Sequence, residues 1–165
     1  MEDCEHLAKW FNDIELQRLW LPRRQESTQR SAETAQSIAE KHQAPSDFKP
    51  LHELIILADE KIIGQTTLYL NPPHRRSKGA KIAWPTIVIG NPTARRQGIG
   101  TIVGKHIIEL SCEAGATHIE AGVFEFNQPI RSLLEKNGFK EIAKVEGFTW
   151  QNGRSWADIR YELAL

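Results

Sequence analysis

Apolar residues follow helical spacing through the first third of the chain. They recur from Leu7 to Leu19, with a break at Asn12-Asp13 where the aspartate can cap a new helix. Pro22 then ends the run, because proline disfavours the helical conformation in the residue before it. A further helix is expected from Ser31 to about His42, capped by Ser31 or by Thr34. The chain is therefore predicted to begin with helices.

Short apolar runs typical of strands replace this spacing in the second third. Residues 54–58 and 62–70 flank a polar turn and predict a hairpin. Residues 82–90 form the next predicted strand, in which Pro85 indicates an edge position or a bulge, because proline cannot donate to a ladder. Three more strands are expected at residues 118–124, 139–150 and 155–163.

Two more helices are expected between these later strands. Residues 98–114 end before Gly115, and residues 129–136 begin with Pro129. The apolar face of the first comprises Ile99, Ile102, Val103, His106, Ile107 and Leu110. Gln151-Asn152-Gly153 predicts a tight turn between the last two strands. Local hairpins with one strand-helix-strand crossover predict a mixed sheet of the α+β type.

Length and composition predict one globular domain spanning residues 1–165. Hydrophobic residues make up 40% of the chain and charged residues 25%, which suits a core buried without disulfides. The 21 basic side chains balance the 21 acidic ones, so no global field favours nucleic acid or an anionic membrane as a partner. No feature of the sequence indicates an oligomeric state.

The two cysteines predict neither a disulfide framework nor a metal site. Cys4 and Cys112 lie far apart without a second ligand nearby, so reduced thiols and a cytoplasmic location are expected. Met1-Glu2-Asp3 lacks the basic and apolar regions of a signal peptide. No apolar run approaches the ~18 residues of a membrane-spanning helix.

The segment from Ile87 to Thr101 has the pattern of an anion-binding corner. An apolar strand runs into a loop and then a helix, and Gly98 and Gly100 leave backbone N–H groups open at the helix start. Arg95 and Arg96 add positive charge and fork-shaped donors. The pattern predicts a phosphate or diphosphate cradle. The alternative is that the glycines only allow close packing and the arginines are solvated.

Two other phosphate-binding patterns fit this segment less well. A Walker A loop is excluded because Gly104-Lys105 is followed by His106 rather than by Ser or Thr. A dinucleotide fold is closer, since the glycines at 98, 100 and 104 loosely match its pattern and Glu120 lies about 20 residues on. That fold needs a series of alternating strands and helices, whereas hairpins surround this loop. A nucleotide-binding oxidoreductase stays an alternative.

Two segments resemble the GNAT superfamily of N-acetyltransferases. Arg95-x-x-Gly98-x-Gly100 after a strand looks like the family's acetyl-CoA signature, Arg/Gln-x-x-Gly-x-Gly/Ala. Asn127 to Phe139 looks like a second family motif, with an asparagine at a strand end, a short helix and a Gly-Phe pair at the next strand. The stretch from Leu7 to Asp13 is most similar to the branch that acetylates N-terminal amines of ribosomal proteins. The resemblance implies a mostly antiparallel twisted sheet flanked by helices, from which the family's usual first strand is missing.

The resemblance also implies acetyl-CoA as the acetyl donor and a primary amine as the acceptor, either a protein N-terminus or a small molecule. The strand end would pair with the pantetheine arm and the helix start would hold the diphosphate. Asn127 would place the pantetheine, or would serve only as a strand-end cap. The residues implied in cofactor binding are Val88, Ile89, Gly90, Arg95, Arg96, Gln97, Gly98, Ile99, Gly100, Thr101 and Asn127.

The catalytic groups depart from the family pattern. Many members carry a tyrosine acid in the short helix, where this chain has Leu134, and a glutamate before the phosphate loop, where it has Ala83 and Trp84. Glu125 and Glu120 are the candidate bases that would take a proton from the amine, and either could instead be a structural carboxylate. The sequence therefore predicts direct acetyl transfer to an amine, with a non-catalytic acyl-CoA-binding module as the alternative.

Some side chains outside these motifs are candidates for an acceptor pocket. Trp20 and Trp84 could line it, while core packing is expected for Trp10 and Phe11. The basic stretch at residues 74–78, in a predicted loop, could meet an anionic acceptor or remain solvated. The identity of the acceptor is not readable from these residues.

Overall fold

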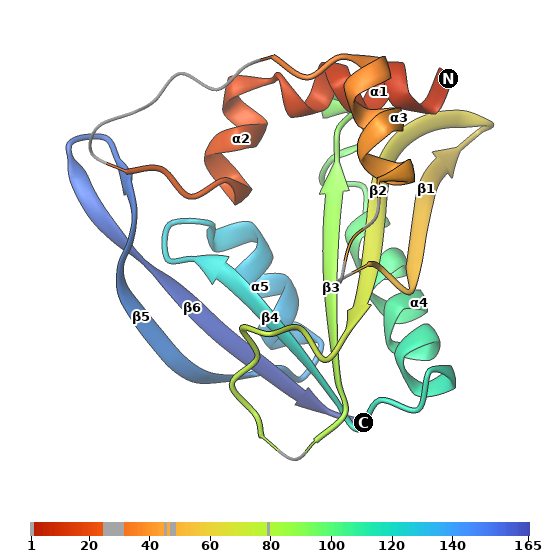
Figure 1. Cartoon of the computed structure of the whole chain (residues 1–165). Helices are drawn as coiled ribbons and strands as arrows, with labels where there is room; N and C mark the ends of the chain where they lie inside the picture. The colour runs from red at the N-terminus through yellow and green to blue at the C-terminus, as the bar shows by residue number, and fades with distance from the viewer. Residues whose placement is uncertain (1, 25–31, 45, 47–48, 79) are drawn as a thin grey trace.

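The helices and strands follow the order expected from the sequence (Figure 1). The computed structural model describes residues 2–24, 32–44, 46, 49–78 and 80–165. The helices are α1 (Glu2–Phe11), α2 (Ile14–Trp20), α3 (Ala35–Gln43), the 3₁₀ helix η1 (Pro92–Ala94), α4 (Ile99–Glu113) and α5 (Gln128–Lys136). The strands are β1 (His52–Ala58), β2 (Lys61–Leu70), β3 (Ile82–Ile89), β4 (His118–Phe124), β5 (Lys140–Gln151) and β6 (Arg154–Ala164). No helix in the described ranges is long and apolar enough to cross a membrane.

The six strands form one sheet in the order β1-β2-β3-β4-β6-β5. Only β3 and β4 run parallel, across the α4 crossover, and all other neighbours are antiparallel. The predicted mixed α+β sheet is therefore confirmed. β1 lies at one edge of the sheet and β5 at the other.

β3 and β4 separate soon after they begin (Figure 1). They pair only through Ile82 with His118 and through Ala83 with Ile119. β3 nevertheless stays paired with β2 from Ala83 to Ile89. The side of β3 that faces β4 therefore lacks a strand partner beyond Ala83, and the sheet opens at its centre.

Pro85 lies at this divergence and not at an edge or a bulge. It stands opposite Leu68 of β2 in unbroken register. The Leu68 carbonyl accepts a hydrogen bond from Leu51 on its other side (2.7 Å), so the Pro85 nitrogen faces away from β2. That side is where β4 has departed, so the missing N–H costs no ladder hydrogen bond. The prediction of an edge or bulge was wrong because an interior strand accepts proline where its neighbour diverges.

Helices cover both faces of the sheet (Figure 1). On one face, the central core comprises Leu68, Ala83, Ile107, Ala116, Ile119, Phe139, Ala157, Ile159 and Tyr161. On the other, Leu7, Ala8, Trp10, Leu16 and Ile38 join α1, α2 and α3, with Ile55 and Ile62 of the sheet packed against them. The core position expected for Trp10 is confirmed, and Phe11 packs against the same cluster half-buried.

Two details of α4 and of the loop before it follow from this packing. Ile102 is 69% exposed and His106 is also exposed, so the apolar face predicted for this helix was too wide. A Cβ on Gly90 would fall 2.0 Å from the nearest atom of the Trp10 ring. Glycine is therefore required at residue 90 for α1 to pack over the end of β3.

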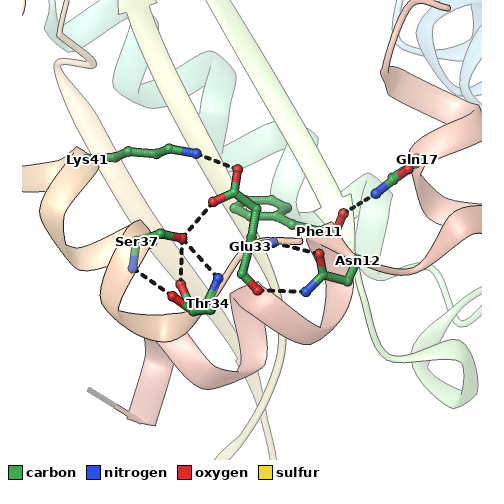
Figure 2. Close-up of polar contacts among 7 residues, drawn as sticks. All are labelled: Phe11, Asn12, Gln17, Glu33, Thr34, Ser37 and Lys41. Carbon is green, nitrogen blue, oxygen red and sulfur yellow. Dashed lines mark hydrogen bonds and ion pairs between the residues drawn. The ribbon is translucent and has the colours of Figure 1, made fainter. Parts of the chain in front are cut away.

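A network of polar contacts ties α1, α2 and α3 together (Figure 2). The Asn12 side chain donates to the Glu33 carbonyl (2.7 Å) and accepts from the Glu33 N–H (2.8 Å). The Glu33 carboxylate in turn accepts from Ser37 Oγ and pairs with Lys41. Thr34 and Ser37 form a capping box, so Thr34 is the N-cap and Ser31 lies outside the described residues.

The segment around α2 is also anchored to the far side of the sheet. Asp13 caps α2 as predicted, accepting from Glu15 N and Leu16 N. Beyond the helix, Arg23 N donates to Thr149 Oγ1 (2.9 Å), and Trp150 N donates to the Arg23 carbonyl (2.9 Å). The segment around α2 is thus tied to the start of α3 through Asn12 and to β5 through Arg23. Residues of all three helices line the cavity at the opening between β3 and β4.

Candidate active site

The loop between β3 and α4 exposes backbone N–H groups at the start of the helix. Gly98 is the N-cap with φ 80°, and α4 has no side-chain cap and no acidic residue in its first turn. The Gly98 carbonyl accepts from Thr101 N and Ile102 N, as in an ordinary first turn. Within the described residues, the N–H groups of Gly98, Ile99 and Gly100 meet no acceptor. Such a corner favours an anion.

Space for a ligand is present at this corner. A Cβ on Gly98 would meet no atom within 4 Å, and one on Gly100 would only touch Leu133 Cδ2 at 3.4 Å. Close packing therefore does not explain Gly98, which suits the ligand interpretation of the motif. Its positive φ also favours glycine. These residues fit the diphosphate expected from the sequence.

The two arginines of the motif lie in different environments. Arg95 is half-buried, and its Nε and Nη2 donate to the carbonyls of Ile89 and Gly90, both at 3.0 Å. Arg95 therefore braces the end of β3 against the loop. Arg96 is exposed, with φ 61°, and Gln97 Nε2 donates to the Thr93 carbonyl (2.7 Å). Arg96 is thus the arginine of this loop whose guanidinium lies exposed beside the open amides.

The predicted pantetheine residues lie along the divergence of the sheet. Val88 pairs with Gln65 and Ile89 with Gly64, so their β2 side is closed and their β4 side is open. Asn127 is 7% exposed, and its Nδ2 donates to the Leu19 carbonyl (3.4 Å) without capping α5. Its role in placing the pantetheine, and the alternative of a strand-end cap, both stay predictions.

A cavity of about 1230 Å³ occupies the opening and extends beneath the helical layer. Val88 and Asn127 line it from opposite sides, together with Leu133 and Leu134 of α5. Residues from α1, α2 and α3 line its roof, among them the 40%-exposed Trp20. Residues 95–101 are not part of its lining, and Leu133, which lines the cavity, lies 3.4 Å from the position of a Cβ on Gly100.

The two carboxylates predicted as bases are both engaged, and neither lines the cavity. Glu120 is 1% exposed and accepts from the N–H groups of Arg76 (2.9 Å) and Ser77 (2.6 Å), which holds the loop at residues 71–78. Burial pushes the pKa of Glu120 up, but these amides and the Arg160 charge together bring it below its usual value. The basic stretch at residues 74–78 is thus held against β4 by hydrogen bonds from its backbone N–H groups to Glu120.

Glu125 pairs with Lys144 on β5. The Lys144 Nζ lies 3.0 Å from Glu125 Oε1, and this hydrogen bond is the main reason that the pKa of Glu125 is lowered. Lys144 also pairs with the exposed Glu146 (3.1 Å). Sequence reasoning could not detect this pairing, because it joins the turn after β4 to β5, a strand that is not a neighbour of β4 in the sheet.

A third carboxylate, which sequence reasoning missed, lines the cavity. Asp158 on β6 is 3% exposed, and its Oδ2 lies 2.6 Å from Arg160 Nε. Burial raises the pKa of Asp158, against the opposing charge of Arg160. A Cβ on Gly122 of β4 would lie 3.0 Å from Asp158 Oδ2 and 3.2 Å from the Trp84 ring. Glycine at 122 therefore lets these two side chains meet at the divergence.

The two tyrosines are the side chains to consider as the acid that protonates the leaving thiolate, because Leu134 stands where many family members carry a tyrosine. Leu134 lines the cavity with no proton to give. Tyr161 is 1% exposed on the other face, where its hydroxyl donates to Glu135 Oε1 (2.9 Å) and accepts from Arg131 Nε (3.1 Å). Burial raises the pKa of Tyr161 and of Tyr69. Of the two, Tyr69 is the one that lines the cavity.

Comparison with known families agrees with this geometry. The family model described as acetyltransferase (GNAT) domain matches residues 1–140. The chain therefore belongs to the GNAT acetyltransferases, enzymes that use acetyl-CoA as the acetyl donor. The predictions of an acyltransferase and of acetyl-CoA are confirmed, and the oxidoreductase and the non-catalytic module are set aside. None of the curated proteins matches the chain significantly.

Solved structures share the fold at low sequence identity. Spermidine N-acetyltransferase from Vibrio cholerae, in complex with CoA and spermine, is 18% identical (TM-score 0.74; 99% of this chain and 90% of that one covered). Ribosomal-protein-alanine N-acetyltransferase from Brucella melitensis is 15% identical (TM-score 0.70; 99% and 95% covered). An acetyltransferase from Salmonella typhimurium with its cofactor acetyl-CoA is 14% identical (TM-score 0.69; 99% and 89% covered). These similarities establish the fold alone.

Proposed function

We propose that this protein transfers the acetyl group of acetyl-CoA to a primary amine bound in the cavity between β3 and β4. The observation that carries the proposal is that β3, whose residues 84–88 line the cavity, leads through a short loop to the open N–H groups at the start of α4. One region suits a diphosphate and the other suits an acceptor.

The donor would be held mainly by backbone groups. The amides of residues 96–100 and the exposed Arg96 would hold the diphosphate, while Val88, Ile89 and Asn127 would contact the pantetheine arm. The Thr101 amide, predicted with them, already donates to the Gly98 carbonyl. Arg95 would keep the strand end in place, since it already bonds the carbonyls of Ile89 and Gly90. When bound, acetyl-CoA supplies a thioester carbonyl carbon that a neutral amine can attack, with a thiolate as leaving group.

Proton removal from the acceptor requires a base, because amines with a pKa near 8 to 10 are mostly protonated at neutral pH. Glu125 and Glu120 remain the bases predicted from the sequence. Glu33, Glu53 and Asp158 are the carboxylates among the residues that line the cavity, and Asp158 lies beside Gly122 of β4, where the sheet opens. Burial raises the pKa of Asp158 and so favours its taking a proton. We therefore propose Asp158 as the general base that takes a proton from the ammonium group of the acceptor.

We assign no side chain of the described residues as the acid that protonates the leaving thiolate. Leu134 stands where a tyrosine is common in the family, and Tyr69 is the tyrosine that lines the cavity. Placement of the two reactants would then supply much of the rate, with solvent as the source of the last proton. The free thiols Cys4 and Cys112 support the proposed cytoplasmic location, and the chain is proposed to act as one domain.

Thiol release from acetyl-CoA tests the proposal. The purified chain should release free CoA with at least one member of a panel of amino acids, peptides and polyamines, and not without an acceptor. Calorimetry should show binding of acetyl-CoA and CoA but not of NADH. Tight acetyl-CoA binding with no thiol release from any amine would contradict amine acetylation while leaving the donor site intact.

A further inference from the structure

Arg160 is a buried cation with an incomplete set of partners. It is 8% exposed and lines the cavity from β6. Its Nη1 has no hydrogen-bond partner within the described residues, and its Nε approaches Asp158 at 2.6 Å without hydrogen-bond geometry. Buried donors are nearly always satisfied in folded proteins, because an unpaired one loses its hydration without compensation. An acceptor atom from a ligand would complete this guanidinium.

The guanidinium is held between aromatic rings. Its carbon lies 5.0 Å from the centre of the Trp84 ring and 5.9 Å from that of Phe148, and both rings line the cavity. His74, from the loop over β4, stacks edge-on against Trp84 at 4.4 Å. These contacts fix the plane of the guanidinium, so its free donor points in a defined direction rather than moving in solvent.

Charged side chains of both signs lie around Asp158 and Arg160. Asp158 accepts no hydrogen bond from any other described side chain or backbone amide, and Arg76 is the further cation that acts on it. Glu120 acts on Arg160 from β4, and His74 is the remaining titratable group nearby. A carboxylate and a guanidinium side by side complement a ligand that carries an ammonium group next to an oxygen.

We propose that Asp158 and Arg160 form the acceptor subsite and select amines that carry a carbonyl or carboxylate oxygen on the adjacent carbon. The proposal rests on the acetyl transfer proposed above. Asp158 binds the ammonium group, and Arg160 Nη1 donates to the oxygen. The α-amino group of a free amino acid and that of a peptide N-terminus share this chemistry. A polyamine has no oxygen and leaves Nη1 unpaired.

Amines with the same side chain, with and without a carbonyl or carboxylate group beside the amine-bearing carbon, test the subsite. The pairs are alanine with ethylamine, leucine with isopentylamine and phenylalanine with phenethylamine, and the peptide arm uses Ala-Gly-Gly, Leu-Gly-Gly and Phe-Gly-Gly. Dissociation constants are measured by calorimetry with CoA present, and kcat/KM by thiol release. At least one oxygen-bearing probe should bind about 10- to 100-fold more tightly than its oxygen-free twin. Tighter binding of the amino acids would show that Arg160 recognises a carboxylate, and tighter binding of the tripeptides would show that it recognises a peptide carbonyl.

Arg160→Lys should remove this discrimination, because lysine keeps the charge beside Asp158 but loses the guanidinium fork. The oxygen-bearing probe should weaken to the level of its twin, while the twin and acetyl-CoA bind as before. Arg154→Lys is the matched control, since Arg154 lies on the same strand, exposed, 3.3 Å over the Trp156 ring. If Arg160→Lys does not fold, Asp158→Asn with Arg160→Met removes both charges together and avoids a lone buried ion.

The outcomes separate the subsite from the reaction. Equal binding of twins by the unchanged protein, preference for spermidine, no binding of any oxygen-bearing probe, or discrimination retained in Arg160→Lys would each overturn the subsite. Thiol release from amines together with any of these results would leave the acetyl transfer standing. Discrimination in binding without thiol release would instead support the subsite and contradict the reaction.

Discussion

The proposed donor corner and the proposed acceptor cavity are built in different ways. The donor corner is a continuous stretch, residues 88–101, in which backbone amides and carbonyls would provide the contacts with acetyl-CoA. The cavity is lined by residues from all three N-terminal helices, all six strands and α5. Its charged pair, Asp158 and Arg160, is contributed by a strand far along the chain from the glycine motif.

This difference explains why one region is readable and the other is not. A backbone site needs glycines at fixed offsets, so it leaves a motif in the sequence. A side-chain site needs only that distant residues meet in space. We therefore expect changes at the donor corner to affect acetyl-CoA alone, and changes in the cavity to affect the acceptor alone.

The largest expected effect separates the two regions at Gly98. Gly98→Glu should weaken acetyl-CoA binding by at least about 100-fold, because its carboxylate would face the diphosphate at the cost of several kcal/mol. Calorimetry measures the affinity. Gly153→Glu is the control, since Gly153 also has a positive φ (75°) and open space around its Cα. Equal losses in both variants would mean that backbone strain, not the phosphate, is responsible.

The second prediction concerns the base. Asp158→Asn should lower kcat by about 100-fold or more, the usual contribution of a general base, with the acetyl-CoA affinity retained. Glu125→Gln should leave kcat within about threefold by the same measure, because Lys144 already holds its carboxylate. Rates are expressed per acetyl-CoA-binding site, which corrects for unfolded protein. The reverse order of effects would favour Glu125 as the base.

Glu120 should matter for stability more than for catalysis. Glu120→Gln removes the charge that holds the Arg76 and Ser77 amides, and should cost about 2 kcal/mol of unfolding free energy, measured with urea. Glu109→Gln, an exposed position on α4, should change it by less than about 0.5 kcal/mol. A large fall in kcat without a fall in stability would instead place Glu120 in the chemistry.

The pH dependence of stability should report the same carboxylate. Because the fold lowers the pKa of Glu120 below its unfolded value, its contribution is fully present above the unfolded pKa of about 4.3. That contribution is lost as the pH falls through the folded pKa. Urea titrations from neutral to acid pH should show a smaller loss for Glu120→Gln than for the unchanged protein. An equal loss of unfolding free energy on acidification in the two proteins would contradict this role of Glu120.

The smallest expected effect lies in the roof of the cavity. Asn12→Ala removes both contacts with the Glu33 backbone (Figure 2) and should raise the KM of the acceptor by about fivefold, in line with about 1 kcal/mol for lost hydrogen bonds. The affinity for acetyl-CoA should not change. Gln36→Ala, which loses only a contact with the exposed Glu40, is the control. An altered acetyl-CoA affinity would show that the two regions are coupled.

The sequence predicted those parts of the fold that local patterns determine. The positive φ values of Asn152 (53°) and Gly153 (75°) match the predicted turn, and β4 has the predicted bounds, residues 118–124. Pro85 was misplaced because its tolerance depends on where β4 leaves β3, which is a property of the sheet. The roles given to residues 88–101, Asn127, Glu120 and Glu125 stay predictions.

The acceptor residues could not be predicted for the same physical reason. Asp158 and Arg160 alternate with Ile159 on a strand, and such alternation also describes an ordinary half-exposed strand. Their burial depends on Trp84, Phe148 and the loop at residues 71–78, which come from other parts of the chain. Tertiary structure alone brings these side chains into one cavity.

A crystal structure with acetyl-CoA tests the central claim most directly. The diphosphate should lie on the N–H groups of residues 98–100, with the acetyl group between β3 and β4 on the side of Asp158. A diphosphate bound elsewhere, or an acetyl group directed away from the cavity, would contradict the account.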